Sequence, residues 1–126
     1  MSIPDSKKEH TESCPIVQYI LVRTDLNWNT GATVAQACHA SVASIIRTLD
    51  SPPTKQYLNN LADMRKIVLK AENADDLTRV EQDLKTSNIA HHVWIEKPEN
   101  IATCIAVSPQ PKSLVQAIFK HLKLLI

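Results

Sequence analysis

Apolar positions along this chain follow two different periods. Four short runs, at 16–22, 67–69, 92–95 and 103–107, are apolar, rich in β-branched residues and bounded by polar segments. Runs of this length and composition predict β-strands, and the first is long enough to be a strand that is buried on both faces. Elsewhere the apolar residues recur every three or four positions, which is the period of an amphipathic α-helix. The pattern therefore predicts a fold that mixes strands and helices.

The longest helical pattern follows Gly31. Its apolar side chains recur every three or four residues, so they fall on one stripe of a helix. Five residues make up this stripe: Val34, Cys38, Val42, Ile45 and Leu49. We expect the stripe to face the core, with Val42 near its centre. The helix should end before Pro52, because the residue before a proline is disfavoured in the helical conformation.

Three further helices complete the pattern. The first covers 54–64, the second begins after Asn73 and reaches about Ser87, and the third has Pro111 at its first position. Their expected inward residues are Tyr57, Leu58, Leu61, Leu77, Val80, Leu84, Leu114, Ile118, Leu122 and Leu125. The order strand, helix, helix, strand, helix, strand, strand, helix predicts an α/β fold. We expect a three-layer sandwich with a four-stranded mixed sheet and helices on both faces.

Length and composition restrict the functions that fit. The 126 residues suit one domain, expected at 15–126, preceded by a disordered leader at 1–14 that shows no apolar period. A single glycine excludes both the P-loop and the GxGxxG dinucleotide motif, which need several residues without a Cβ atom. Fourteen Lys and Arg against 13 Asp and Glu leave a net charge of +1, so a surface for nucleic acid must be local.

Signals for the compartment point in one direction. No apolar run approaches the roughly 20 residues that cross a bilayer, and the polar N-terminal segment lacks the pattern of a signal or transit peptide. The three cysteines are odd in number and lack CxxC spacing, which favours reduced thiols over disulfides. We therefore expect a cytoplasmic protein with no membrane contact.

The helix after the glycine also has a second face, on which polar side chains stand among alanines. Five residues share it: Gln36, His39, Ala40, Ala43 and Arg47. In one interpretation, a neighbouring element packs closely there and the polar groups satisfy buried backbone atoms. In the other, the helix N-terminus attracts a phosphate or carboxylate, His39 accepts a proton from water and Gln36 orients it. The spacing alone leaves both interpretations open.

A metal site is not expected from the cysteines and histidines. Cys38 and His39 are adjacent, and neighbours on a helix diverge by about 100°, so they seldom bind one ion. No paired ligand spacing includes Cys104. Cys38 also lies on the predicted core stripe, where a buried thiol is inert.

Basic residues gather in two segments of the sequence. Residues 54–70 hold four basic residues against one acid, and 111–126 hold three lysines and no acid. Such segregation can form a phosphate-binding face on a nearly neutral protein. Solvated flanks of strands and helices give the same counts, so the two interpretations weigh equally.

Several segments together resemble a known family. The run Val17–Leu26, followed by Gly31–Ala40 (GATVAQACHA), resembles the archaeal and eukaryotic type of peptidyl-tRNA hydrolase. Arg65–Leu77 looks like the family's second strand and acidic helix start, and Ile105–Pro109 looks like its last strand and exit turn. Gly31–Ala40 and Pro98–Ala106 (PENIATCIA) resemble the divergent branch called peptidyl-tRNA hydrolase domain-containing protein. The resemblance covers the whole predicted domain.

This resemblance implies an activity, a partner and a set of site residues. Members of the family hydrolyse the ester that joins a peptide to the terminal ribose of tRNA, and they use no metal or organic cofactor. The family positions that this sequence retains are Arg23, Asp25, Gln36, His39 and Thr103. The family lysine after the glycine is Ala32 here, and a shorter segment, Glu96–Ile101, replaces the one that carries the family's aspartate.

Two functions remain open. The first is a peptidyl-tRNA hydrolase in which His39 or Asp25 acts as the base that activates water. Gln36 and Arg23 then position the ester, and Glu96 stands in for the missing aspartate. The tRNA phosphates are expected on four basic residues: Arg65, Lys66, Lys120 and Lys123.

The second function is not catalytic. A relative could keep the fold in order to bind tRNA or a protein partner, which includes a second copy of the chain in a homodimer. Arg23 and Asp25 would then pair only with each other at a strand end, Thr103 would fill a strand, and Glu96 would be a solvated loop acid. Turnover of peptidyl-tRNA distinguishes the two functions.

Overall fold

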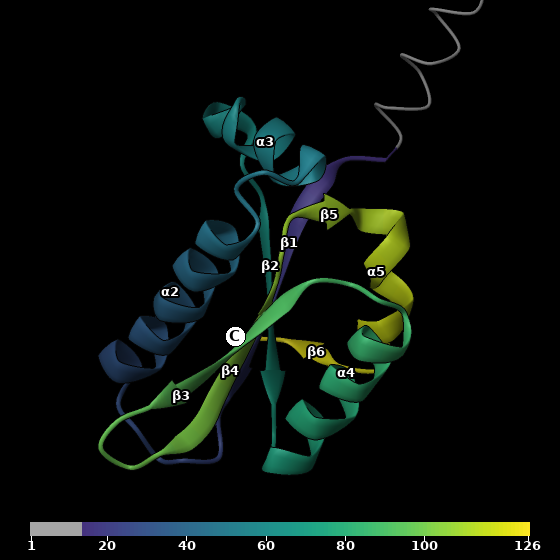
Figure 1. Cartoon of the computed structure of the whole chain (residues 1–126). Helices are drawn as coiled ribbons and strands as arrows, with labels where there is room; N and C mark the ends of the chain where they lie inside the picture. Colours follow the sequence, from purple (N-terminus) through teal and green to yellow (C-terminus); the bar gives the residue numbers. More distant parts are fainter. Residues whose placement is uncertain (1–13) are drawn as a thin grey trace, which may run out of the picture.

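The computed structural model describes residues 14–126 (Figure 1). Four strands form most of its sheet: β1 (Ile16–Arg23), β2 (Lys66–Ala71), β3 (His91–Glu96) and β4 (Ile101–Val107). They lie in the order β3-β4-β1-β2, with β1 and β2 parallel and the other neighbours antiparallel. The predicted four-stranded mixed sheet is confirmed. Two strands of two residues each extend it: β5 (Gln110–Pro111) beside β1 and β6 (Lys123–Leu124) beside β2.

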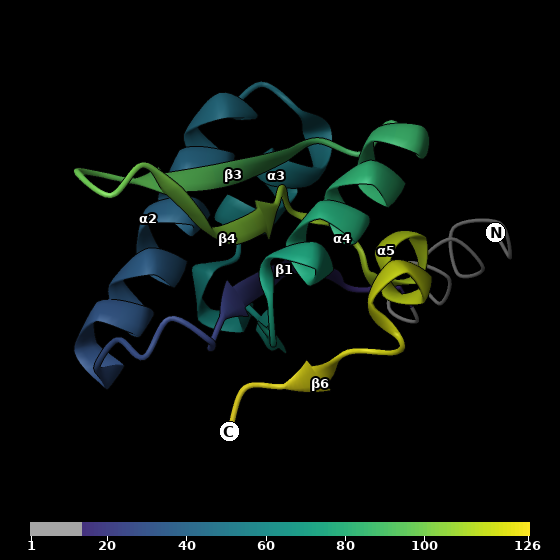
Figure 2. The same cartoon turned by 90° about the horizontal axis from the view of Figure 1, so that it is seen from below.

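Helices cover both faces of this sheet. α2 (Thr30–Arg47) and α3 (Pro52–Leu58) lie on one face, while α4 (Ala74–Thr86) and α5 (Lys112–Phe119) lie on the other (Figures 1 and 2). A single 3-10 turn, Leu61–Asp63, follows α3. The predicted α/β sandwich of three layers is therefore confirmed. Within residues 14–126, no helix is both long enough and apolar enough to cross a bilayer.

The central strand β1 divides the core between the two faces. Six of its eight residues are buried, as the continuous apolar run predicts. Val17, Tyr19 and Leu21 pack toward α4 and α5, whereas Ile20 and Val22 pack toward α2. The alternation of side chains along one strand thus supplies both halves of the core.

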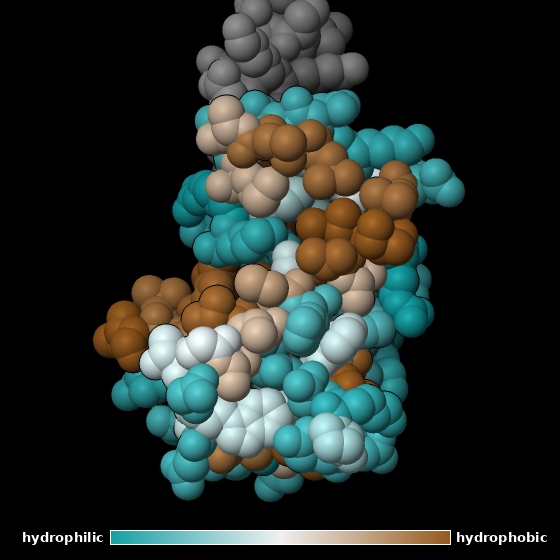
Figure 3. All heavy atoms as spheres, turned by 90° about the vertical axis from the view of Figure 1, so that its left-hand side faces the viewer, coloured by the Kyte–Doolittle hydropathy of each residue, from teal (hydrophilic) through white to brown (hydrophobic). Residues whose placement is uncertain are grey.

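The predicted core stripe of α2 is wrong. Val34, Val42 and Leu49 are exposed, Val42 at 60% of its surface, and Cys38 is exposed as well. Figure 3 views the molecule from the side on which α2 lies, and apolar side chains are visible at this surface. The buried residues of α2 are instead small or polar: Gln36, Ala40, Ser41 and Ser44.

Close packing explains which face of α2 is buried. Ala40 has no exposed surface, and side chains this small allow the helix backbone to approach the sheet. Two polar side chains on this face have partners on the strands: the Ser41 hydroxyl donates to Gln18 Oε1 at 2.7 Å, and Gln36 Oε1 accepts from the Thr103 hydroxyl at 2.9 Å. Burial therefore follows shape and hydrogen bonding rather than hydrophobicity alone.

The other helices follow the prediction in part. α4 is confirmed, with Asn73 Oδ1 accepting from the Asp76 amide at 2.9 Å and its three predicted apolar residues buried. α3 ends at Leu58, and Leu61, expected inside, is exposed. The final helix also ends early, at Phe119, and after a turn Lys123–Leu124 pairs with the open edge of β2 as β6. Val115 and Phe119 of α5 are buried, while Leu114, expected inside, is exposed.

The predicted leader lies almost entirely outside the described residues, which begin at Cys14. Cys14 itself contacts α5, because its Sγ lies 2.7 Å from the hydroxyl oxygen of Ser113. The domain boundary at 14/15 stays a prediction.

Candidate active site

The loop before α2 fixes the start of that helix. Asn29 is the N-cap: its Oδ1 accepts a hydrogen bond from the Ala32 amide at 2.8 Å, and its carbonyl oxygen accepts one from the Thr33 amide at 3.0 Å. These two amides are therefore occupied by the chain itself. The interpretation in which the free amides of this helix start attract a phosphate or carboxylate loses these donors.

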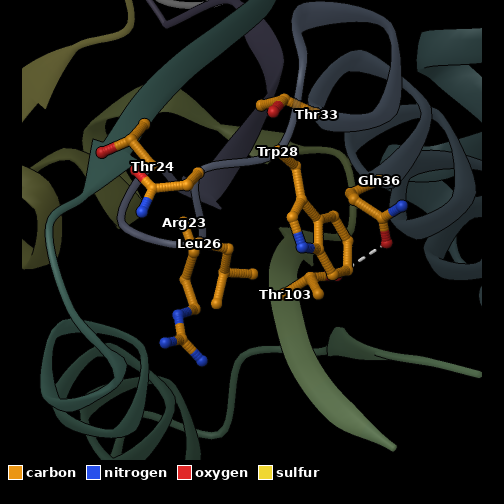
Figure 4. Close-up of a pocket in the computed structure, with 8 residues that line it drawn as sticks. Arg23, Thr24, Leu26, Trp28, Thr33, Gln36 and Thr103 are labelled. Atoms are coloured by element: carbon orange, nitrogen blue, oxygen red, sulfur yellow. Dashed lines mark hydrogen bonds between the residues drawn. The ribbon is translucent and has the colours of Figure 1, made fainter. Parts of the chain in front are cut away.

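Gln36 and Thr103 form a buried polar pair between α2 and β4. The Thr103 hydroxyl donates to Gln36 Oε1 at 2.9 Å (Figure 4), and Gln36 Nε2 donates to the Ala32 carbonyl oxygen at 3.2 Å. Both side chains are almost fully buried. The pair fixes the orientation of the Gln36 carboxamide, because each end of the amide has a partner.

Arg23 and Asp25 pair at the end of β1. Arg23 Nε and Nη2 donate to the two carboxylate oxygens at 3.0 and 2.8 Å, and Nη1 donates to the Ala102 carbonyl oxygen at 3.2 Å. The hydrogen bonds from Arg23 lower the pKa of Asp25, which makes its carboxylate a weak base. The pairing that the sequence offered as the alternative to catalysis is thus present.

A small pocket of ≈ 20 Å³ is lined by Gln36 and Thr103 and by Arg23 (Figure 4). Its lining comes from the end of β1, the loop after it, α2 and β4: Arg23, Thr24, Leu26, Asn27, Trp28, Thr33, Gln36 and Thr103. A volume of this size holds about one water molecule. Three of the residues expected at the site, Arg23, Gln36 and Thr103, are therefore brought together around a space that fits water.

His39 of α2 and Glu96 of β3 both contact Trp94. The His39 ring stacks on Trp94, with ring centroids 4.7 Å apart, and Trp94 Nε1 donates to Glu96 Oε1 at 2.9 Å. Among residues 14–126, the pocket lining includes neither these two side chains nor Asp25. The expected catalytic residues are thus divided: Arg23, Gln36 and Thr103 line the pocket, whereas His39 and Glu96 lie outside it.

The four basic residues expected to bind tRNA do not gather around the pocket. Lys66 is exposed at the start of β2 but its ammonium is partly buried, and Nζ donates to Gln18 Oε1 at 2.7 Å and to the Tyr57 hydroxyl at 3.3 Å. Burial lowers the pKa of Lys66. Arg65 is exposed before β2 and Lys123 is exposed on β6, while Lys120 follows α5 on the opposite side of the sheet from α2 (Figure 1).

Two tryptophans escaped the sequence analysis. Trp28 lines the pocket and Trp94 carries the His39 ring, and they are the only two in the chain. Trp28 lies between two asparagines directly before a helix, a polar setting in which a large aromatic side chain could have been taken as a signal. Trp94 gave no such signal, because an aromatic residue is ordinary in a strand.

Cysteine and metal chemistry gain nothing from the geometry. Cys38 is exposed, which corrects its predicted place in the core, and Cys104 is buried. Burial raises the pKa of the Cys104 thiol, so this side chain stays protonated. Within residues 14–126, no three His, Cys, Asp or Glu side chains lie together in a way that could hold a metal ion.

Comparison with known proteins assigns this fold to a family. The family model for peptidyl-tRNA hydrolase PTH2 matches residues 16–125, and the chain belongs to this family. It is 46% identical over 114 residues to a mouse protein named "Putative peptidyl-tRNA hydrolase PTRHD1", across 86% of this chain and 81% of the mouse protein. The human protein of the same name is 45% identical over the same shares. The peptidyl-tRNA hydrolase of Methanothermobacter thermautotrophicus is 29% identical, across 86% of this chain and 98% of the archaeal protein.

Proposed function

We propose that this protein hydrolyses the ester of peptidyl-tRNA in the cytosol and so returns tRNA to translation. The observation that carries the proposal is the buried Gln36–Thr103 pair, which lies at the family's motif and faces a space that fits one water. Buried polar pairs of this kind hold a reacting group in a fixed geometry. No cofactor enters the proposal.

In the proposed reaction, water bound by the Gln36 carboxamide and the Thr103 hydroxyl attacks the ester carbonyl carbon. A C–O bond to the water oxygen forms and the bond to the ribose oxygen breaks. The attacking water loses a proton and the ribose oxygen takes up a proton as it leaves; His39, which is exposed outside the pocket one helical turn after Gln36, is the proposed base and reaches this water through solvent. The products are a free peptide and tRNA. Arg23 makes three of its five possible N–H hydrogen bonds within the chain, which leaves two for the substrate.

The same geometry predicts slow turnover. The family lysine is replaced by Ala32, the Asp25 carboxylate is held by Arg23, and the Glu96 carboxylate accepts from Trp94. Loss of a positioned base costs about a hundredfold to ten-thousandfold in rate, and loss of an electrostatic stabiliser costs a similar factor. We expect detectable hydrolysis that is well below that of a family member with the full motif.

The decisive experiment measures release of N-acetylaminoacyl groups from tRNA by the purified full chain. Thr103→Val removes the pocket hydroxyl at nearly constant volume and should abolish turnover, as should Gln36→Ala and His39→Ala. Thr78→Val is the matched control, because Thr78 is exposed on α4 and its hydroxyl bonds only the helix backbone. Ala32→Lys should raise the rate. Turnover that survives both Thr103→Val and His39→Ala would place the chemistry elsewhere.

The second candidate is a binding module without catalysis. It is favoured by one observation: each carboxylate among the expected catalytic residues already has a partner, Asp25 with Arg23 and Glu96 with Trp94. Binding of tRNA without turnover, in wild type and Ala32→Lys alike, would establish this function instead. Binding of a protein in place of tRNA would do the same for a protein partner.

A further inference from the structure

A second, open pocket of ≈ 400 Å³ lies at the other end of α2. It is formed where the last turns of α2 and α4 meet the start of β3. The polar residues that line it include Ser44, Arg47, Lys85, Asn88 and His91. Among the described residues, none of the side chains that line it is a carboxylate.

Ser44 is the unexplained group in this pocket. Only 1% of its surface is exposed, and its Oγ is the one buried side-chain polar atom within residues 14–126 that has no hydrogen-bond partner. An unpaired buried hydroxyl costs about 1–3 kcal/mol. Because Ser44 also lines the pocket, a bound ligand that accepts a hydrogen bond would satisfy this hydroxyl.

Two cationic side chains, Arg47 and Lys85, line this pocket. Arg47 is exposed and forms no ion pair or hydrogen bond through its side chain with any residue of 14–126, and Lys85 adds a second cation. Glu81 offsets part of their charge, because its Oε2 lies 3.7 Å from Lys85 Nζ and 3.5 Å from His91 Nε2. The pKa of the neighbouring His92 is lowered by burial and then by the positive field of Arg47 and His91. Arg47 is therefore a cation without a partner within residues 14–126 and can donate to an anion, against the partial negative charge at the carbonyl ends of α2 and α4.

We propose that this pocket binds a phosphate group of an RNA backbone. A phosphate offers acceptor oxygens in several directions. The side chains that can donate to it are the Arg47 guanidinium, the Lys85 ammonium, the Ser44 hydroxyl and the Asn88 amide. Ser44 follows Gln36 by eight residues on the same helix, so the two pockets are about 12 Å apart along α2. A tRNA whose terminal ester lies at Gln36 can therefore present a backbone phosphate here, and this choice of RNA rests on the proposed function.

The site is tested by titrating the full chain with inorganic phosphate and, separately, with tRNA, while backbone amide resonances are followed by NMR. Phosphate should shift the amides of Ser44, Arg47 and His91 in a saturable manner. Arg47→Gln should abolish these shifts, and Ser44→Ala should weaken them without loss of thermal stability, because it removes an unpaired hydroxyl. Arg79→Gln is the matched control, since Arg79 is exposed on α4 away from the pocket lining.

The RNA arm separates the sources of phosphate. Arg47→Gln should weaken tRNA binding severalfold and reduce the slope of log K against log salt by about one, the loss of one phosphate contact. Phosphate shifts with unchanged tRNA affinity would overturn the RNA assignment in favour of a free phosphate compound. The absence of phosphate shifts would overturn the site. Failure of the proposed hydrolysis is seen independently, in the Thr103→Val assay, and leaves both binding results interpretable.

Discussion

The two faces of the sheet bury different kinds of side chain. The face under α4 and α5 packs thirteen buried apolar residues in one cluster, which includes Leu84 and Phe119. The face under α2 has a cluster of only five, and the largest of these is Ile20. Buried polar side chains occupy the remaining space on that face, among them Gln36 and Ser44. One face thus supplies most of the apolar burial, while both candidate pockets have lining residues on the other.

A polar network shows how the α2 face replaces apolar burial. Gln18 Oε1 accepts from the Ser41 hydroxyl and from Lys66 Nζ, each at 2.7 Å, and Lys66 Nζ also donates to the Tyr57 hydroxyl. Tyr57 in turn donates to the Arg65 carbonyl oxygen at 2.9 Å. Such networks specify one geometry, because each member loses a partner if its neighbour moves. On the α2 face, hydrogen bonds therefore fix the positions of side chains where few apolar side chains are buried.

The largest expected effect tests the apolar face. Leu84→Ala should lower the free energy of unfolding by about 2–5 kcal/mol, because Leu84 is fully buried and the cavity left behind cannot collapse completely. Leu114→Ala, at an exposed position of α5, is the control and should cost far less. Chemical denaturation measures both. Equal losses for the two variants would contradict the assignment of the core to this face.

The next effect tests the polar network. Gln18→Met keeps the volume but removes the acceptor shared by Ser41 and Lys66, and should cost about 1–3 kcal/mol of unfolding free energy. Gln116→Met, on the exposed surface of α5, is the matched control. Chemical denaturation again gives the comparison. A stabilising Gln18→Met would mean that the network contributes less than apolar packing at this site.

A third prediction concerns alkaline pH. Burial raises the pKa of Tyr57 from 10.0 to about 12, so above pH 10 the unfolded chain releases a proton that the folded chain retains. Stability should therefore fall as the pH rises from 10 to about 12. Tyr57→Phe should reduce this fall when melting temperature is followed against pH. The pKa of Tyr19 is also raised by burial, so part of the dependence should remain. An unchanged pH profile would exclude Tyr57 as a source.

The smallest expected effect corrects the sequence analysis most directly. Val42→Asp, which the predicted core stripe would make lethal to folding, should change stability by only about 0.5 kcal/mol, because Val42 is 60% exposed. The same substitution at Ala40, which has no exposed surface, should prevent folding. Expression and melting of the two variants decide which face of α2 is inside. A cooperative Ala40→Asp protein would reverse the assignment.

Strong local signals predicted much of the fold. The continuous apolar run of β1 and the Asn73 cap of α4 were sufficient, because each depends on neighbours in the sequence. The buried face of α2 was not predictable from periodicity, since alanine and serine packing depends on how closely the sheet approaches. The end of α5 was not predicted for a similar reason: Lys123–Leu124 forms a strand because it pairs with the open edge of β2.

The candidate site was predicted as a set of residues but not as an arrangement. The family resemblance named Gln36 and Thr103, yet their hydrogen bond joins residues that are 67 positions apart. The pairing of Arg23 with Asp25, which the sequence offered only as an alternative to catalysis, is present, because two residues separated by one lie on the same side of a strand end. The stacking of His39 on Trp94 depends on where α2 crosses β3, which no spacing in the sequence records.

Both edges of the sheet are irregular, and this affects how the protein behaves at high concentration. On one side β6 pairs with only two residues of β2 and presents the exposed Lys123. On the other side the pairing of β3 shifts register between Trp94 and Ile95. Short, charged or kinked strands are poor templates for the backbone of another chain. The chain should therefore resist strand-by-strand aggregation while it refolds at high concentration.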